Sequence, residues 1–217
     1  MKIQVKLKLK IGLLKKNKIK TKKMDEKILL ITTHDQKLNI LENEFVNPIV
    51  NIIKNHNNSN NYKYIILHYS KINNNLLKKY SKIIICGTAL KDEKYLKDIN
   101  KFLWIKETNQ HILGICAGSQ IIAKIFNAQI IKKSEIGIYK PKIIKNDPIL
   151  YNENLNEIYS LHNNSLKIDN TKNNVFEIIA KTQITPQIFK IKNHFIYGIL
   201  FHPEIKNKNI INNFLNL

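Results

Sequence analysis

Apolar residues are arranged differently in the two halves of the chain. Up to about residue 127, short runs of consecutive apolar residues alternate with segments in which apolar residues recur at helical spacing. A short continuous apolar run is typical of a parallel strand that is buried on both faces. The first half therefore predicts strands over 27–32, 64–69, 83–86 and 112–115, and helices over 38–53, 76–80, 91–105 and 118–127.

After residue 128 the pattern changes to short segments that predict strands. The last two are expected to form a hairpin around Lys192 and Asn193, and residues 210–215 a closing helix. Strands that alternate with helices favour a doubly wound sheet. We therefore expect an α/β fold, a single domain with a mostly parallel, twisted sheet flanked by helices. The strands predicted in this half span 129–133, 137–144, 157–161, 176–180, 187–191 and 195–201.

The net charge of +20 does not by itself indicate a nucleic-acid partner. All 36 basic residues are lysines, and Asn and Ile are abundant too, which points to a bias of the coding DNA. Nucleic-acid sites usually combine lysine with arginine, because the guanidinium group binds phosphate in a bidentate way. We therefore do not expect nucleic acid as a partner.

The first 23 residues carry ten lysines and no acidic residue. Lysines interrupt every apolar run there, so this segment does not have the pattern of a secretory signal. It is compatible with an added edge strand, with a basic tail, or with Met24 as the true start. We expect residues 1–23 to be a basic extension outside the core, and residues 24–217 to form the domain.

The two cysteines, Cys86 and Cys116, are too few for a disulfide framework or a four-thiolate metal site. They fit a reducing compartment, and we expect a cytoplasmic protein. No apolar run approaches the ~18 residues that a membrane helix needs. The histidines have no second ligand at metal-binding spacing. We therefore expect neither a metal nor a cofactor, and no membrane contact.

Residues 112–120, Ile-Leu-Gly-Ile-Cys-Ala-Gly-Ser-Gln, contain the strongest chemical signal. Gly114 and Gly118 flank Cys116 at the spacing of a nucleophile elbow, a tight turn between a strand and a helix. A helix N-terminus favours the thiolate form of cysteine, and the amide of Ala117 would point towards a developing oxyanion. The alternative is a buried structural thiol, because free cysteine is among the most buried residues.

A second signal is His202-Pro203-Glu204, at the end of a predicted strand. Residues two apart in an extended segment face the same way, so Glu204 can accept a hydrogen bond from the imidazole of His202. A histidine oriented by a carboxylate is the base that a cysteine nucleophile needs. The alternative is a surface histidine beside a turn. The third strand ends at Gly87, at the same sheet edge as Cys116, where doubly wound folds place their sites.

Together, the segment Gly114–Gln120, the distant His202-Pro203-Glu204 and the strand ending in Cys86-Gly87-Thr88 resemble the class I glutamine amidotransferases. The resemblance covers residues 26–217. It implies a flavodoxin-like fold and a glutaminase reaction, in which a thiolate attacks the side-chain amide of L-glutamine, ammonia leaves, and water hydrolyses the glutamyl thioester.

The same resemblance implies a catalytic triad of Cys116 as nucleophile, His202 as base and acid, and Glu204 as the orienting group. The family loop usually carries two glycines, and here only Gly87 is present. The resemblance further implies an oxyanion hole formed by Gly87, Thr88 and Ala117, and a glutamine site that includes Gln120, Leu161, Asn163 and Asn164.

No phosphate-binding glycine-rich loop is present for an ammonia acceptor, so the acceptor is expected in trans. From Met24 the chain is similar in length to the free-standing amidotransferase subunits of GMP, anthranilate and aminodeoxychorismate synthases, and a GMP synthase is the preferred partner. One alternative is a γ-glutamyl hydrolase or peptidase on the same fold. The other is a non-catalytic basic regulator or nucleic-acid binder, which only the lysine-rich first 23 residues support.

Overall fold

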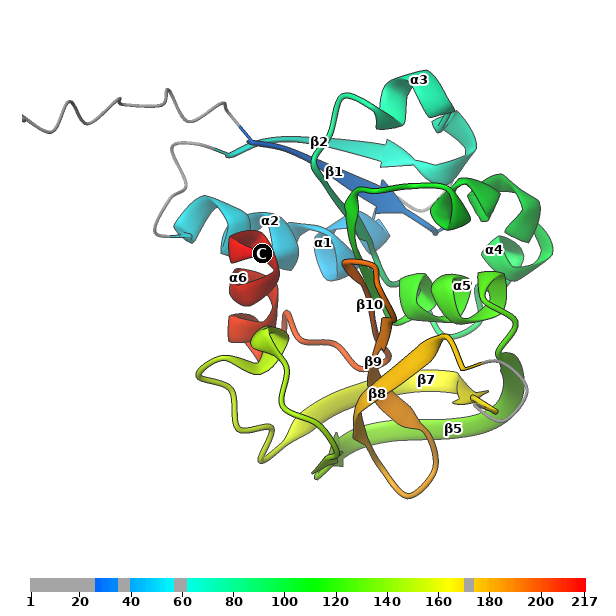
Figure 1. Ribbon diagram of the computed structural model, residues 1–217, viewed down its shortest axis with the longest axis vertical. Helices are drawn as coiled ribbons and strands as arrows, with labels where there is room; N and C mark the ends of the chain where they lie inside the picture. The colour runs from blue at the N-terminus through cyan, green and yellow to red at the C-terminus, as the bar shows by residue number, and fades with distance from the viewer. Residues whose placement is uncertain (1–25, 35–39, 57–61, 170–173) are drawn as a thin grey trace, which may run out of the picture.

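The computed structural model describes residues 26–34, 40–56, 62–169 and 174–217 (Figure 1). The predicted basic extension over residues 1–23 lies outside the described residues. The main sheet has eight strands, whose bounds are β1 (Glu26–Thr32), β2 (Tyr62–His68), β3 (Lys82–Ile85), β4 (His111–Ile115), β6 (Lys142–Ile143), β8 (Phe176–Lys181), β9 (Pro186–Ile191) and β10 (Ile196–Ile199).

The order across this sheet is β2-β1-β3-β4-β10-β9-β8-β6. Strands β2, β1, β3, β4 and β10 pair in parallel, whereas β9, β8 and β6 complete the sheet in antiparallel fashion. The predicted α/β fold with a mostly parallel sheet is confirmed. The predicted hairpin is confirmed too, since β9 and β10 are joined through Asn193, whose positive φ of 62° is typical of asparagine in a tight turn.

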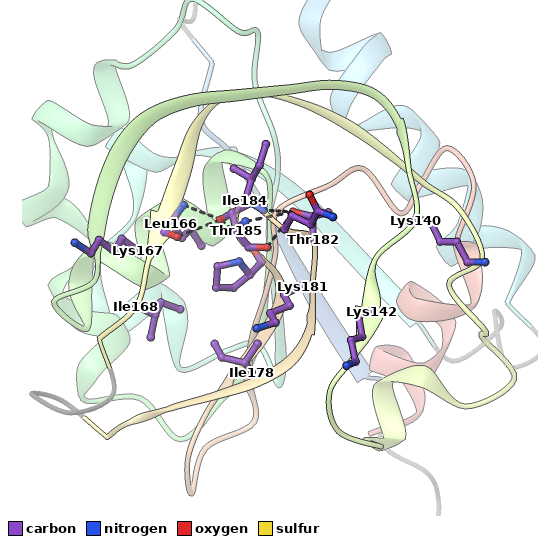
Figure 2. Close-up of a pocket in the computed structure, with 12 residues that line it drawn as sticks. Lys140, Lys142, Leu166, Lys167, Ile168, Ile178, Lys181, Thr182, Ile184 and Thr185 are labelled. Atoms are coloured by element: carbon purple, nitrogen blue, oxygen red, sulfur yellow. Dashed lines mark hydrogen bonds between the residues drawn. The ribbon is translucent and has the colours of Figure 1, made fainter.

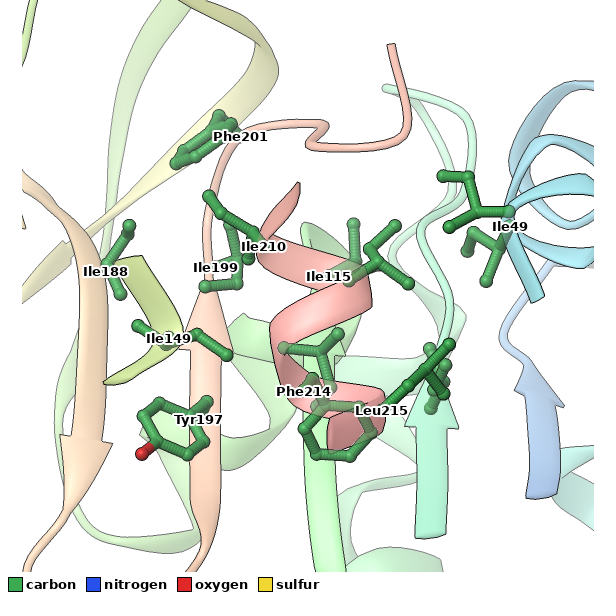
Figure 3. Close-up of a cluster of buried hydrophobic side chains, with 14 of the residues drawn as sticks. Ile49, Ile115, Ile149, Ile188, Tyr197, Ile199, Phe201, Ile210, Phe214 and Leu215 are labelled. Carbon is green, nitrogen blue, oxygen red and sulfur yellow. The ribbon is translucent and has the colours of Figure 1, made fainter. Parts of the chain in front are cut away.

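Helices cover both faces of the sheet, because its central strands are apolar on both sides. One apolar cluster includes side chains of α2 (Asn47–Asn55) and α6 (Lys208–Asn216), and Figure 3 shows Ile210, Phe214 and Leu215 of α6 packed towards Ile115 and Ile199. The other cluster includes α5 (Ala117–Ile125), which lies against β3 and β4. Burial of these side chains stabilises the domain by the hydrophobic effect.

Two predicted helices differ from the structure. The helix expected over 38–53 is divided into α1 (Ile40–Phe45) and α2, with Pro48 in the first turn of α2, where the missing amide proton costs nothing. The helix expected over 91–105 is a short α4 (Lys94–Lys97) followed by a 3-10 helix, η3 (Ile99–Lys106). Asp98 lies between them and accepts a hydrogen bond of 2.6 Å from the hydroxyl of Tyr69.

The short helix expected over 76–80 is α3 (Asn74–Leu77), which begins two residues earlier. Its N-cap is Asn73, whose side chain accepts a hydrogen bond of 2.9 Å from the amide of Leu76. Asparagine is a preferred N-cap residue, so this signal was present in the sequence. A further 3-10 turn covers Tyr69–Lys71, and another covers Pro148–Leu150.

A separate two-stranded antiparallel ribbon pairs β5 (Gln129–Tyr139) with β7 (Ile158–Lys167), in the lower part of Figure 1. The strands expected over 129–133 and 137–144 are therefore mostly one strand, with an irregularity in the register between Lys132 and Glu135. The strand expected over 157–161 continues to Lys167. The sequence did not predict β5 as one continuous strand, because its polar and apolar residues do not alternate as they do in a typical surface strand.

Candidate active site

The segment around Cys116 has the strand–turn–helix form expected of an elbow. Strand β4 ends at Ile115, and α5 begins at Ala117. Cys116 itself has φ 48° and ψ −102°, a backbone conformation that non-glycine residues rarely adopt and that is typical of functional turns. The turn is held by a hydrogen bond of 2.8 Å from its amide to the carbonyl of Ile199.

Gly114 and Gly118 are required by close backbone approach. A Cβ atom on Gly114 would lie 2.5 Å from the backbone of Gly118, and one on Gly118 would lie 2.2 Å from the carbonyl oxygen of Ile85. Both distances are far below van der Waals contact, so larger residues would push α5 away from the sheet. The two glycines therefore let the helix start directly above strand β3.

His202 and Glu204 follow β10, next to β4, and are almost fully buried. The Nδ1 atom of His202 lies 2.7 Å from Oε1 of Glu204, as the sequence predicted. The surroundings of Gly87 show that Cys116 lies close to His202. A Cβ atom on Gly87 would lie 3.0 Å from Cε1 of His202 and 3.4 Å from Cβ of Cys116. Cys116, His202 and Gly87 therefore lie close together, at the carboxyl ends of β4, β10 and β3.

The charges around His202 favour its protonated form. Burial alone would lower the pKa of His202, but the negative charges of Cys116 and Glu204 outweigh burial and hold the pKa well above 6.5. In contrast, burial raises the pKa of the Cys86 thiol. Cys86 is fully buried and is part of the apolar core, so it is a packing residue and a poor nucleophile.

Three backbone amides near Cys116 have no acceptor within the described part of the chain: those of Gly87, Thr88 and Ala117. The side chain of Thr33, at the end of β1, contacts the carbonyl oxygens of Cys86 and Gly87 at 3.1 and 3.3 Å. Because a peptide unit is planar and trans, tying down a carbonyl also fixes the opposite direction of the next N–H. Thr33 thereby orients the amides of Gly87 and Thr88.

Strand β7 crosses beside the cysteine. The sulfur of Cys116 lies 3.7 Å from the carbonyl oxygen of Leu161, to which it can donate a hydrogen bond only in its protonated form. The side chain of Gln120 is buried under the same strand, where its Nε2 donates to the carbonyl of Asn164 at 3.3 Å and its Oε1 accepts from the hydroxyl of Tyr95 at 2.8 Å. These contacts hold the strand against α5.

The side chains of Asn163 and Asn164 are directed to the loop before α4. Asn163 donates to the carbonyl of Leu90 at 3.2 Å, and Asn164 donates to Glu93 at 3.0 Å. The predicted site residues thus lie on α5, β7 and the loops after β3 and β10, with Gly87, His202 and Leu161 beside Cys116. Sequence reasoning missed Thr33, which directly follows the apolar run over 27–32, and Tyr95, which lies among charged residues, because neither belongs to a recognisable motif.

A cavity of about 750 Å³ lies elsewhere, between the end of β7 and the turn joining β8 to β9. Figure 2 shows four lysines around it, Lys140, Lys142, Lys167 and Lys181. None of the predicted site residues lines it. Across the described ranges, no three His, Cys, Asp or Glu side chains are grouped as metal ligands would be. No helix there has the length and apolar character needed to cross a membrane.

Comparison with known proteins identifies a family and similar folds. The family model described as glutamine amidotransferase class-I matches residues 42–216. A curated relative, one of the separate subunits of GMP synthase [glutamine-hydrolyzing] in Saccharolobus solfataricus, is 29% identical over 150 residues, which are 65% of this chain and 78% of that protein.

A longer relative, GMP synthase [glutamine-hydrolyzing] of Wolbachia pipientis, is 29% identical over 169 residues, or 71% of this chain but only 32% of that protein. Among solved structures, a protein of Thermoplasma acidophilum assigned as a GMP synthase subunit superposes with a TM-score of 0.72 at 22% identity. The superposition covers 88% of this chain and 92% of that one. At that identity the likeness shows the fold.

Proposed function

The chain belongs to the class-I glutamine amidotransferase family, and from this premise we propose that it hydrolyses L-glutamine through a thioester on Cys116 and delivers the ammonia to a synthetase. One observation supports this most directly. A cysteine with strained backbone angles lies beside a buried histidine–carboxylate pair and three amides without acceptors in the described chain. This combination provides a nucleophile, a base with its orienting group, and donors for an oxyanion.

In the proposed reaction, the Cys116 thiolate attacks the amide carbon of the glutamine side chain. The carbonyl oxygen becomes an oxyanion, which the amide of Ala117 and those of Gly87 and Thr88 stabilise. The His202 imidazolium then donates its proton to the departing nitrogen, so that ammonia leaves and a thioester remains.

Hydrolysis of the thioester uses the same groups in reverse. Neutral His202 takes a proton from a water molecule, the hydroxide attacks the thioester carbon, and the thiolate leaves as glutamate is released. Glu204 accepts the hydrogen bond from Nδ1 throughout and stabilises the positive charge on the ring. We place the amino-acid end of glutamine along β7, at Leu161, Asn163 and Asn164, with Gln120 supporting that strand.

We assign the ammonia acceptor to a GMP synthase, acting in trans in the cytoplasm. The support comes from the relatives: the Saccharolobus protein is a separate subunit of a GMP synthase, and the Wolbachia GMP synthase is about three times as long as the aligned region. Ammonia is neutral and diffuses freely once formed, so its productive use requires an acceptor close to Cys116.

The test is to measure glutamate released from glutamine by the purified protein, alone and with the synthetase subunit of the same organism's GMP synthase. We expect release that increases when the synthetase is added. Absence of release in both conditions, together with no covalent labelling by a thiol-reactive glutamine analogue, would refute the proposal. Hydrolysis of γ-glutamyl peptides at a higher kcat/KM than glutamine, with no response to the synthetase, would instead establish a γ-glutamyl hydrolase.

Replacing Glu204 with glutamine should shift the pH profile of glutamine hydrolysis. His202 must be protonated to release ammonia, so activity is lost as the pH rises through its pKa. The charge of Glu204 is one of the causes that raise this pKa. Its removal should therefore move the alkaline limb to lower pH. The matched control is Glu157→Gln, at an exposed carboxylate that pairs with Lys206. Identical alkaline limbs in wild type and Glu204→Gln would contradict the role given to Glu204.

Replacing Thr33 with valine should lower kcat with little change in KM. Valine keeps the branched shape but cannot donate to the carbonyls of Cys86 and Gly87, so the amides of the oxyanion hole lose their fixed direction. One weakened donor corresponds to a decrease of about 10²-fold in kcat. Thr33→Ser should restore most of the rate. Thr32→Val is the control, since the Thr32 hydroxyl makes no hydrogen bond within the described residues. An unchanged kcat in Thr33→Val would contradict this role.

A further inference from the structure

The segment 135–138 of strand β5 has its polar and apolar sides reversed. Glu135 faces inward and is 1% exposed, whereas Ile136 and Ile138 face outward and are 55% and 53% exposed. In a strand, a shift of one residue exchanges the two faces, so this arrangement is specified by the pairing with β7. Burial of a carboxylate costs free energy unless its hydrogen bonds offset that cost, and two exposed isoleucines on one face of a strand contribute to an apolar patch.

The inner side is a polar network. Glu135 pairs with His162 of β7 at 3.4 Å and accepts a hydrogen bond from the side chain of Gln187 on β9. These contacts fix the register of the ribbon, because Glu135 and His162 are directly opposite residues of β5 and β7. They explain the buried side, but they leave the outward isoleucines unexplained.

The outer side is a contiguous apolar surface. Ile136 lies opposite Leu161, and Ile138 lies opposite Tyr159. Directly opposite residues of an antiparallel pair have their side chains on the same face, about 5 Å apart. We call these four residues the ribbon face. Exposed apolar patches of this kind mark interaction sites on proteins that are otherwise polar outside.

The ribbon face lies on the strand that touches the candidate nucleophile. The carbonyl oxygen of Leu161 is 3.7 Å from the thiol of Cys116, while the side chain of Leu161 is part of the ribbon face. In addition, the carbonyl of Tyr159 accepts a hydrogen bond of 3.0 Å from the amide of His202. A protein bound to the ribbon face would therefore be separated from Cys116 and His202 only by strand β7.

The charges beside the ribbon face select the kind of partner. Lys132 and Lys133 precede Ile136 on β5, and Lys140, which also lines the cavity of Figure 2, directly follows the strand. Lys132 is paired with Glu93, whereas Lys133 and Lys140 form no ion pair within the described residues. A second copy would bring the same lysines together across a two-fold axis, and the chain carries a net charge of +20. The complementary partner has an apolar centre and an acidic rim.

We infer that the ribbon face is the docking surface for an acidic face of the ammonia-accepting synthetase subunit. The inference rests on the proposed function, and it adds which surface of this chain meets the synthetase and what chemistry the opposing surface carries. Docking there places the acceptor over the strand beside Cys116, so that ammonia has a short path. It also lets the synthetase affect the position of Leu161 and thereby the rate of hydrolysis.

The test compares Ile136→Ser/Ile138→Ser with the control Ile65→Ser/Leu103→Ser, whose two residues are 48% and 49% exposed on β2 and η3. Calorimetric titration with the synthetase subunit of the same organism's GMP synthase measures Kd for each. We expect the ribbon-face variant to bind at least tenfold more weakly than wild type, with the control within twofold. Glutamine hydrolysis without the synthetase should be equal in all three proteins. Lys133→Glu/Lys140→Glu should also weaken binding, and more so at low salt.

Several results would overturn the inference. Wild-type Kd in the ribbon-face variant would do so, as would tighter binding by the Lys133→Glu/Lys140→Glu variant. Dimerisation of the wild type alone in sedimentation, lost in the ribbon-face variant, would identify a second copy as the occupant. If the wild type hydrolyses glutamine but binds no synthetase subunit, the docking surface is refuted and the glutaminase function stands. If the wild type binds through the ribbon face but does not hydrolyse glutamine, the glutaminase function is refuted and the docking surface stands.

Discussion

Replacing Cys116 with alanine should reduce glutamine hydrolysis by about 10⁴-fold or more, because no other group can form the covalent intermediate. The decrease should appear in kcat, with glutamine still bound along β7. A coupled assay of glutamate formation measures the rate, and mass spectrometry after treatment with a thiol-reactive glutamine analogue measures covalent labelling. Wild type should gain one adduct and Cys116→Ala none.

The control for this variant is Cys86→Ala, which removes the other thiol. Burial raises the pKa of Cys86 and its side chain is part of the apolar core, so the variant should keep its activity within a few-fold. Its stability should fall by about 1 kcal/mol, the cost of a small buried truncation. The proposed mechanism fails if Cys116→Ala retains wild-type hydrolysis, or if Cys86 carries the label.

Replacing Gly118 with alanine should destabilise the whole domain. The added methyl group would lie 2.2 Å from the carbonyl oxygen of Ile85, and backbone atoms cannot move aside as a side chain can. Overpacking against a rigid neighbour costs about 3 kcal/mol. For a domain of this size that corresponds to a decrease in Tm of about 6–12 °C. Thermal unfolding followed by circular dichroism measures it.

The matched variant is Gly87→Ala, which adds the same methyl group at the candidate site. Its nearest neighbours are side-chain atoms of His202, Phe45 and Cys116 at 3.0 to 3.4 Å, which can shift by a few tenths of an ångström. We therefore expect nearly wild-type Tm but strongly reduced hydrolysis, since the methyl group occupies the space between Cys116 and His202. An equal decrease in Tm for the two variants would contradict the difference in surroundings described here.

The sequence carried enough information to predict the sheet and the elbow. Continuous apolar runs such as residues 27–32 are typical of buried parallel strands. Two glycines flanking Cys116 have few structural explanations other than a tight turn. The pair of His202 and Glu204 was predictable because their spacing of two residues has a fixed geometric meaning. The roles assigned to these residues stay predictions until the variants above are measured.

Other features could not be predicted, because they depend on partners far away in sequence. The ribbon exposes Ile136 and buries Glu135, opposite to the ordinary preference of each, and only the pairing with β7 decides between the two faces. The helix expected over 91–105 is interrupted at Asp98, whose hydrogen-bond partner Tyr69 lies 29 residues earlier. Thr33 gains its importance from a loop more than fifty residues later.

Strand β10 determines when the site can first exist during synthesis on the ribosome. It is the last strand of the described chain, yet it lies between β4 and β9, and its residues pair with β4 across more than eighty residues of sequence. Such long-range parallel pairing is slow to form. Until it forms, Cys116 has neither the carbonyl of Ile199 that fixes its turn nor His202 beside it. The nascent chain therefore carries an ordinary thiol, and its reactivity should emerge only with the completed sheet.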